Sequence, residues 1–237
     1  MKDISFRVGP HDFVCIVGPS GCGKTTLLKL IAGLLEPTSG YISFEQETSN
    51  GRLRTALVFQ EHGIFPWMTV LDNVAFGLEM QGRRRRECLE RAKSFLNRIG
   101  LQAFLHSYPH ELSVGMKQRI DIARAFVADP AFLLLDEPFG SLDAQTKLVL
   151  QEELMKFWRE QPKSVVYVTH DIQEAILLGD RVLVMSGRPA SILEEIPVPL
   201  PRPRDMLSSD EKTVKSIQWH IWNLIKTEVR KSLSLAE

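Results

Sequence analysis

A stretch of nine residues, "GPSGCGKTT" at 18–26, has the composition of a loop that wraps around phosphate groups. It fits the pattern G-x-x-x-x-G-K-[ST], which follows a buried strand and opens a helix. Glycines let the backbone approach an anion closely, so the N–H groups of residues 21–26 would point inward. Lys24 would reach the β- and γ-phosphates of a nucleotide, and the Thr25 hydroxyl would ligate Mg²⁺. The alternative is a glycine-rich turn without a ligand. The residues assigned to phosphate binding are Gly18, Pro19, Ser20, Gly21, Cys22, Gly23, Lys24, Thr25 and Thr26.

Two carboxylates end a second apolar run, "FLLLDEPFGSLD" at 132–143. The carboxyl end of a parallel strand lies at the crevice where ligands bind in open α/β sheets. We expect Asp136 to hold Mg²⁺ through water, and Glu137 to orient and deprotonate an attacking water. Phosphoryl transfer needs little beyond positioning, charge neutralisation and such a base. Taken alone, an Asp-Glu pair after a strand is often only an exposed strand end.

Two more polar side chains follow apolar runs in the same way. His170 ends "VVYVTH", and Gln60 ends "TALVFQ". A lone histidine at such a position is more often structural, but beside a phosphate loop it could bind a γ-phosphate and sense its loss. The Gln60 amide could reach the Mg²⁺ or the attacking water.

The stretch "ELSVGMKQR" at 111–119 allows two interpretations. Ser113 precedes a helical pattern and could simply cap it by accepting from a free N–H group. The same N–H groups, together with Gly115 and the basic residues that follow, could instead hold a phosphate.

Composition limits the class of protein. The chain has 237 residues, of which 44% are hydrophobic, with 29 Lys+Arg against 29 Asp+Glu. Without net charge there is no field to attract nucleic acid, and "RRRR" at 83–86 is better interpreted as a solvated helix face than as a contact with such a partner. Three cysteines without a C-x-x-C pair argue against a disulfide framework or a zinc site and favour a reducing compartment. The sequence has neither a signal peptide nor an apolar run of membrane-spanning length, so we expect a cytosolic protein that could attach to a membrane through a partner.

Apolar periodicity predicts an α/β protein. Continuous apolar runs are typical of parallel strands that are covered on both faces, and helical patterns lie between them. "YISFEQ" at 41–46 alternates instead, which predicts a small antiparallel edge with a turn near 49–51. The expected buried strands lie at 13–18, 55–60, 131–136, 164–170 and 180–185, and the expected core helices at 25–35, 117–126 and 144–161.

Two segments depart from this alternation. Residues 61–114 show no convincing strand and read as helices at 69–80 and 83–100. The tail is Pro-rich at 196–205, which predicts extended chain. An amphipathic helix over about 208–232 follows, and Ser208 and Glu211 have capping-box spacing. We therefore divide the chain into an α/β core at 1–60 and 115–195, a helical subdomain at 61–114 with residues 112–116 at its boundary, and a linker plus amphipathic helix at 196–237.

These motifs, in this order, resemble the ATP-binding subunits of ABC transporters over roughly residues 1–190. The resemblance implies a phosphate-loop NTPase core with a parallel sheet, flanking helices, a small antiparallel edge and an inserted helical subdomain. It implies ATP and Mg²⁺ as cofactors, with Thr25, Gln60 and Asp136 at the metal and Glu137, His170 and Gln60 in hydrolysis. It further implies a head-to-tail pair of subunits, in which Ser113, Val114, Gly115 and Asp143 of one chain serve the nucleotide of the other.

The same resemblance implies the remaining partners. An apolar surface around Phe65, Pro66, Trp67 and Met68 would receive integral membrane permease subunits, a solute-binding protein would act indirectly, and nucleic acid would play no part. The protein would lie at the cytoplasmic face of the bacterial inner membrane. "FPWMTVLDNVAFGLEMQG", "DEPFGSLD" and "EIPVPLPRPRD" look like the branch that imports nitrate, sulfonates or taurine.

Three departures from the family pattern stand out. Val114 replaces a usual glycine, so its backbone must be one that valine tolerates, and Met116 replaces a usual glutamine. The strand with an adenine-stacking aromatic would precede Met1, which predicts weak discrimination between ATP and GTP. Two other functions are alternatives: a nucleotide-gated assembly module with little turnover, and an ABC-type ATPase of chromosomes or repair that is not linked to transport.

Overall fold

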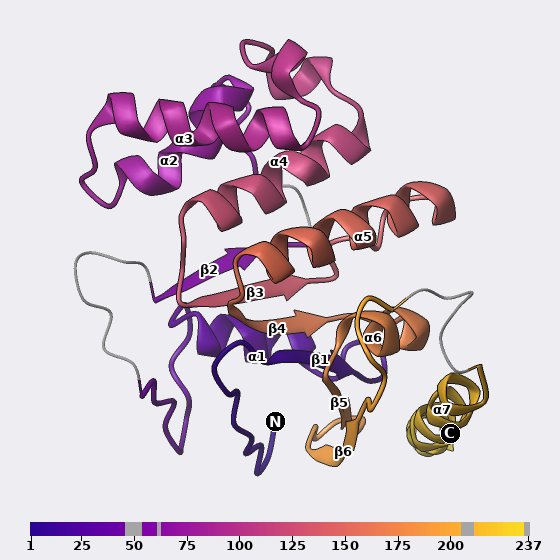
Figure 1. Cartoon of the computed structure of the whole chain (residues 1–237). Coiled ribbons are helices and arrows are strands. Elements are labelled where there is room, and N and C mark those ends of the chain that lie inside the picture. Colours follow the sequence, from indigo (N-terminus) through magenta and orange to yellow (C-terminus); the bar gives the residue numbers. More distant parts are fainter. Residues whose placement is uncertain (46–53, 61–62, 205–210, 235–237) are drawn as a thin grey trace. The chain divides into compact units, whose positions relative to one another are not determined.

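The structure is a computed structural model that describes residues 1–45, 54–60, 63–204 and 211–234 (Figure 1). The chain folds into two compact units, one made of residues 1–38 with 164–237 and the other of residues 39–163. The predicted division into a core, a helical subdomain at 61–114 and a tail stays a prediction.

The first unit is built on three parallel strands, β1 (Phe13–Val17), β4 (Ser164–Val168) and β5 (Arg181–Met185). β1 lies between the other two, with Cys15 opposite Tyr167 on one side and Val182 on the other. Every residue of β1 and β4 is buried, as their continuous apolar runs predict. The helices of this unit are α1 (Lys24–Ile31), α6 (Ile172–Leu178) and α7 (Glu211–Ser234).

The antiparallel edge lies elsewhere than the sequence predicts. Residues 41–45 form no strand, so the expectation for 41–46 is wrong where it can be compared, and Gln46 and the turn near 49–51 lie outside the described residues. The edge is β6 (Ile192–Pro197), which pairs antiparallel with β5. Its sequence, "ILEEIP", hides the strand because two adjacent glutamates interrupt the alternation and a proline ends it.

Within its described residues, the second unit combines a parallel strand pair with four α-helices. β2 (Thr55–Val58) pairs with β3 (Phe132–Asp136), with Val58 opposite Leu135. The helices are α2 (Val70–Glu79), α3 (Arg85–Arg98), α4 (Val114–Val127) and α5 (Ala144–Glu160), with short 3₁₀ turns at Gln102–Phe104 and Pro109–Glu111. Rings from three of these helices meet in its core, where Phe95 lies 4.9 Å from Phe157 and 6.3 Å from Phe126.

The arginine block at 83–86 forms the entry to α3 and is balanced by acids. Arg85 pairs with Asp72 and Glu79, and Arg86, which is 92% exposed, pairs with Glu90. These contacts confirm the interpretation of this block as a solvated helix face.

The Pro-rich segment before α7 is anchored by its arginines. Arg204 donates to the Ile176 carbonyl at 3.0 Å, and Arg202 pairs with Asp180 at 2.7 Å. Both acceptors lie in or just after α6. These contacts tie residues 202–204 to the first unit, although residues 198–204 have no regular secondary structure.

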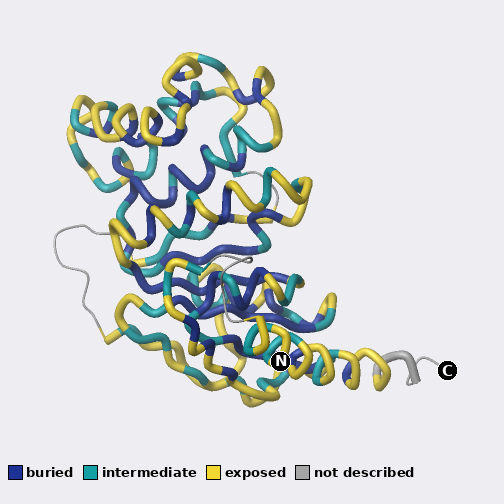
Figure 2. Tube along the Cα trace, turned by 45° about the vertical axis from the view of Figure 1, so that its right-hand side comes forward, coloured by how far each residue is buried: buried dark blue, intermediate teal, exposed yellow. Residues whose placement is uncertain are grey.

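Helix α7 packs against α6 and β5 of its own unit. The apolar stripe that the sequence predicts is the side of α7 that packs against the unit. Ile221 is fully buried, and Val214, Ile217, Leu224 and Ile225 are half-buried. Most of the other described residues of the helix are exposed (Figure 2). The predicted cap Ser208 lies outside the described residues. None of the described helices is both long and apolar enough to cross a membrane.

Glu228 shows how α7 is attached. It is 9% exposed, and its Oε2 accepts from the backbone N–H of Gly187 at 3.1 Å, while Lys231 pairs with Oε1. The hydrogen bond from Lys231 keeps the pKa of Glu228 below its usual range, although burial opposes this. Glu228 is therefore part of the docked side of the helix.

The docking of α7 predicts a difference between two substitutions on this helix. Ile221→Ala leaves a cavity under the helix, and large-to-small changes in a core cost about 2–5 kcal/mol. Trp219→Ala, at a side chain that is 64% exposed, is the matched control. We expect Ile221→Ala to speed amide hydrogen exchange throughout α7, as measured by mass spectrometry, and Trp219→Ala to leave it near the wild-type rate. Equal exchange in the two variants would show that the helix is not held through Ile221.

Candidate functional site

The loop between β1 and α1 requires glycine at several positions. A Cβ on Gly18 would lie 2.9 Å from the Met185 carbonyl oxygen, so β5 leaves no room for a side chain. Gly21 and Gly23 have φ values of 73° and 114°, in the left-handed region that glycine adopts without strain. The loop thus follows a path that other residues would not allow, and it delivers the chain to the first turn of α1.

The start of α1 is arranged to bind an anion. Its N-cap is Gly23, and no side chain caps the helix. The first N–H groups of a helix lack intrahelical partners and carry the positive end of the helix dipole. Such an end is a ready site for phosphate.

Lys24 brings a cation into the same loop. Its side chain is buried, and Nζ donates to the carbonyl oxygens of Gly18 at 2.9 Å and Pro19 at 3.1 Å. The ammonium group is therefore enclosed by the loop rather than extended into solvent. The role of Lys24 at the β- and γ-phosphates stays a prediction.

Arg188 supports the loop from outside, and the sequence analysis missed it. Its Nε donates to the Gly21 carbonyl oxygen at 2.7 Å. Arg188 lies in the connection from β5 to β6, and β5 is the parallel neighbour of β1. The one signal that could have pointed to it is its position just after the carboxyl end of a predicted buried strand.

His170 leaves β4 at the same sheet edge as the phosphate loop leaves β1. Thr169, the preceding residue, donates its backbone N–H to the Ile16 carbonyl at 3.1 Å, which ties the end of β4 to β1. Asp171 then caps α6 by accepting from the N–H groups of Gln173 and Glu174. His170 is exposed between these two anchors. Within the first unit, the structure brings His170 and the loop of residues 18–23 to one edge, as the sequence predicts.

Buried polar side chains fix the turn that carries His170. Tyr167 donates its hydroxyl to Glu174 Oε1 at 2.6 Å, and the Thr169 hydroxyl donates to Glu174 Oε2. Burial and the neighbouring Glu174 carboxylate raise the pKa of Tyr167 well above its usual value. Tyr167 thus remains a hydrogen-bond donor at neutral pH. Its bond to Glu174, together with that of Thr169, fixes the turn between β4 and α6 that carries His170.

In the second unit, Asp136 is the last residue of β3 and is buried. Gln60 lies two residues beyond the end of β2, the parallel neighbour of β3, and is exposed. Because parallel strands end at a common edge, both side chains belong to the carboxyl edge of this strand pair. The sequence predicts this placement.

Glu137 has an unusual backbone. Its φ is 45°, in the left-handed region that costs a residue other than glycine about 1–2 kcal/mol. A tight turn holds it, since Gly140 donates its N–H to the Glu137 carbonyl at 3.0 Å. Residues in such conformations cluster at functional sites, where the surrounding structure over-determines them. The sequence predicts that Glu137 follows the end of this strand, as it does, but gives no sign of this backbone conformation.

Ser113 is the N-cap of α4, and its Oγ accepts from the Met116 N–H at 3.3 Å. Val114 opens the helix and is 48% exposed. Its backbone is helical, so the valine at a position where the family usually has glycine meets no conformational obstacle. Asp143 caps α5 by accepting from the Thr146 N–H at 3.0 Å, and this bond lowers the pKa of the exposed Asp143 carboxyl.

The apolar surface around Phe65 is fixed by three polar residues that the sequence analysis did not name. The Arg124 guanidinium donates to the Gly63 carbonyl at 2.7 Å, and Asp121 accepts from the Gly63 N–H at 3.1 Å. Buried Asn73 accepts from the Phe65 N–H at 2.7 Å and donates to the Phe65 carbonyl.

The side chains of this surface differ in exposure. Trp67 is 69% exposed, Pro66 is also exposed, and Phe65 and Met68 are half-buried. The Phe65 ring lies 5.5 Å from that of Trp67. Trp67 is thus the most exposed aromatic side chain of this surface, and it rests against the better-buried Phe65.

Comparison with known proteins identifies the chemistry that these parts serve. The sequence profile of a family described as ABC transporter matches residues 1–140. The nitrate import ATP-binding protein NrtD of Synechocystis sp. is 44% identical over 222 residues, which cover 93% of this chain and 81% of that protein. The taurine import ATP-binding protein TauB of Yersinia pestis is 43% identical over 197 residues, covering 83% of this chain and 77% of that protein. An uncharacterized ABC transporter ATP-binding protein of Methanocaldococcus jannaschii is 44% identical over 234 residues, with 98% and 86% covered.

Solved structures agree with these relatives. The dimeric structure of MJ0796, a bacterial ABC transporter cassette, matches with a TM-score of 0.73 and 32% identity over 84% of this chain and 90% of that chain. A post-hydrolysis state of the same cassette with ADP and Pi matches with a TM-score of 0.71 over the same shares. The predicted phosphate-loop NTPase fold is confirmed.

The bond between Arg188 and Gly21 predicts an effect on nucleotide affinity. Arg188→Ala frees the Gly21 carbonyl and loosens the loop, and a typical hydrogen bond contributes about 1 kcal/mol, or roughly a fivefold change in affinity. We therefore expect the Kd for MgATP, measured by calorimetry, to rise about fivefold. Arg159→Ala is the matched control, since this exposed arginine also donates to a backbone carbonyl, that of Met155. An unchanged Kd in Arg188→Ala would show that Arg188 does not stabilise the nucleotide-binding form of the loop.

Proposed function

The chain belongs to the ABC transporter family and is an ATPase, and we propose that it powers import of a small anionic solute through a membrane permease. For ATP binding, the observation that carries the proposal is the enclosed Lys24 ammonium beside the uncapped start of α1. A buried cation and free N–H groups in one glycine-rich loop form a site for the phosphates of ATP.

The residues of the second unit fit a role with Mg²⁺. This ion prefers oxygen ligands, takes few of them from protein and keeps several waters. The Asp136 carboxylate and the Gln60 amide offer such oxygens in this unit. The Thr25 hydroxyl offers another in the first unit. When bound, Mg²⁺ would neutralise charge on the β- and γ-phosphates.

We assign the general base to Glu137 and the γ-phosphate contact to His170. A carboxylate held in a strained turn is pre-positioned to orient water and accept its proton. His170 follows a fixed strand end and is exposed, so it can reach a ligand without rearrangement of the chain around it.

The segment at 112–116 and Asp143 are proposed to act on the nucleotide of a second copy of the chain. The dimeric cassette with which this chain shares 32% identity supports a pair of subunits. Ser113, Val114 and Gly115 lie at the start of α4, and Asp143 at the start of α5, so both helix starts could face a partner's phosphate.

The import function rests on the relatives. NrtD is a nitrate import protein and TauB a taurine import protein, and both are similar to this chain over most of its length. We propose a solute of that class, a permease that docks on the Phe65–Met68 surface, and a solute-binding protein that delivers the solute to it. The subunit would lie at the cytoplasmic face of the bacterial inner membrane. The alternatives of a module with little turnover and of an ATPase without transport are not favoured by these relatives.

The role of Glu137 is tested by Glu137→Gln. The amide keeps the shape of the side chain but cannot take a proton from water, so MgATP affinity should stay near wild type. General-base catalysis is worth about 10²–10⁴-fold, and turnover in a phosphate-release assay should fall by at least about 100-fold. Glu152→Gln, at an exposed glutamate on α5, is the control and should turn over normally. Wild-type turnover in Glu137→Gln would assign the base elsewhere, and a wild type that releases no phosphate at millimolar ATP would favour the module with little turnover.

The action of Ser113 on the partner is tested by Ser113→Arg in the Glu137→Gln background. The bulky side chain would fill the space of a partner's γ-phosphate, whereas the chain's own phosphate loop is at residues 18–26. We expect Glu137→Gln to sediment as a dimer with MgATP, and the double variant to remain monomeric with unchanged monomer affinity for ATP. Loss of ATP binding in the monomer would show that the segment acts in its own chain. A dimer as stable as the parent would leave Ser113 as a helix cap only.

A further inference from the structure

Helices α4 and α5 lie side by side and start at the same end. A Cβ on Gly115 would lie 3.3 Å from Thr146 Cγ2, so the first turns of the two helices touch. Farther along, Arg119 Nε lies 3.3 Å from Glu153 Oε2. Because both contacts advance in the same direction along both helices, α4 and α5 run parallel, and their N-caps Ser113 and Asp143 lie at the same end.

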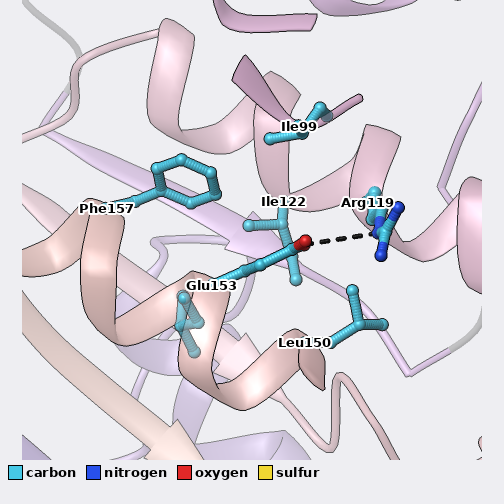
Figure 3. A pocket seen from close by; sticks show the side chains of 7 residues that line it. Ile99, Arg119, Ile122, Leu150, Glu153 and Phe157 are labelled. Atoms are coloured by element: carbon cyan, nitrogen blue, oxygen red, sulfur yellow. Dashed lines mark ion pairs between the residues drawn. The ribbon is translucent and has the colours of Figure 1, made fainter. Parts of the chain in front are cut away.

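The Arg119–Glu153 ion pair sits in an apolar setting between the two helices (Figure 3). The two side chains are 28% and 30% exposed. They border a cavity of about 10 Å³, which has room for one water molecule and excludes any larger ligand. Burial raises the pKa of Glu153, while Arg119 and Lys156 lower it. The apolar residues around the pair are Ile99, Ile122, Leu150, Leu154 and Phe157.

Such a pair is poorly suited to add stability. Taking two charges out of water costs about as much as their attraction returns, and apolar side chains of similar volume often stabilise equally well. What an ion pair between apolar surfaces can supply is register, because a shift of one helix along the other separates the charges and leaves both in an apolar environment. Arg119 lies less than two turns from the N-cap Ser113 of α4, and Glu153 lies almost three turns from the N-cap Asp143 of α5.

We propose that Arg119 and Glu153 are positioning residues that hold the start of α4 in register with the start of α5, so that the two N-termini act together on one nucleotide of the partner subunit. The inference rests on the proposed function, in which Ser113 and Asp143 serve the partner's ATP. Two parallel helix starts that touch add their positive ends at one place. Groups that bind phosphate must be held within about 0.5 Å of their working positions, which the Gly115–Thr146 contact and the ion pair together can ensure.

The test measures dimerisation rather than turnover. In the Glu137→Gln background, the ATP concentration that gives half-maximal dimer is determined by analytical ultracentrifugation. We expect Glu153→Gln and Arg119→Gln each to raise it by about five- to tenfold, within the range of coupling between contacting residues. Exchange of the charges, Arg119→Glu with Glu153→Arg, should bring it back to within about twofold of the parent. The affinity of each monomer for MgATP should not change.

Glu160→Gln is the matched control. It breaks the ion pair between Arg98 and Glu160, which also joins α5 to a neighbouring helix, but at the far end of α5 from Asp143. We expect this variant to dimerise at the ATP concentration of the parent. An equal effect of Glu160→Gln and Glu153→Gln would mean that any lost ion pair on α5 weakens the dimer, and it would overturn the assignment.

The outcomes separate the inference from the function on which it rests. If Ser113→Arg abolishes dimerisation while both single neutralisations leave it unchanged, the positioning role is wrong and the function stands. If Ser113→Arg also has no effect, the proposed action on the partner fails. A third outcome is that the neutralised variants dimerise poorly while the exchanged pair, with the melting temperature of the parent, fails to restore dimerisation. In that case the attraction between the two charges does not position the helices, and the inference is wrong. Glu153→Gln, which keeps the volume of the side chain, remains informative if the exchanged pair does not fold.

Discussion

Parallel pairing of buried strands is the constraint on which the rest of each unit depends. A parallel strand can be followed only by a connection that leaves its carboxyl edge, and neighbouring strands share that edge. In the first unit, β1 ends at the phosphate loop, β4 at His170 and β5 before Arg188. In the second unit, β2 ends before Gln60 and β3 at Asp136. Residues that are far apart in sequence are thus brought to one edge of each unit, because neighbouring parallel strands end on the same side.

The helix starts that meet these edges are of two kinds. α1 begins at Gly23 without a side-chain cap, whereas α4 and α5 are capped by Ser113 and Asp143. An uncapped start leaves its N–H groups for a ligand and would be costly if it were buried without one. Lys24 adds a further donor rather than an acceptor: its ammonium satisfies the Gly18 and Pro19 carbonyl oxygens, and these two bonds hold the loop together. The phosphate loop can therefore remain folded while its N–H groups stay available.

The sequence predicts the parts of this molecule that depend on composition and spacing. Long apolar runs identify β1 to β5, and the glycine pattern identifies the loop of residues 18–23, because few other structures satisfy those patterns. It does not predict contacts between residues far apart in the chain, such as Arg188 with Gly21 or Arg124 with Gly63. The sequence does not predict β6, because pairing with β5 rather than an alternating pattern of its own makes this segment a strand. Nor does it predict the left-handed backbone of Glu137, because a glutamate on its own disfavours this conformation. The surrounding turn imposes it.

The two interpretations of Ser113 turn out to be compatible. A helix leaves the N–H groups of its N-cap and first three residues without intrahelical partners, and the Ser113 hydroxyl accepts from just one of them, that of Met116. The N–H groups of Val114 and Gly115 point the same way and are not used by this cap. A phosphate at the helix start can bind them while the Ser113 cap stays in place, so no structure has to be broken before a ligand binds. Capping fixes the direction of the first turn, and that fixed direction is what makes the remaining N–H groups a usable anion site.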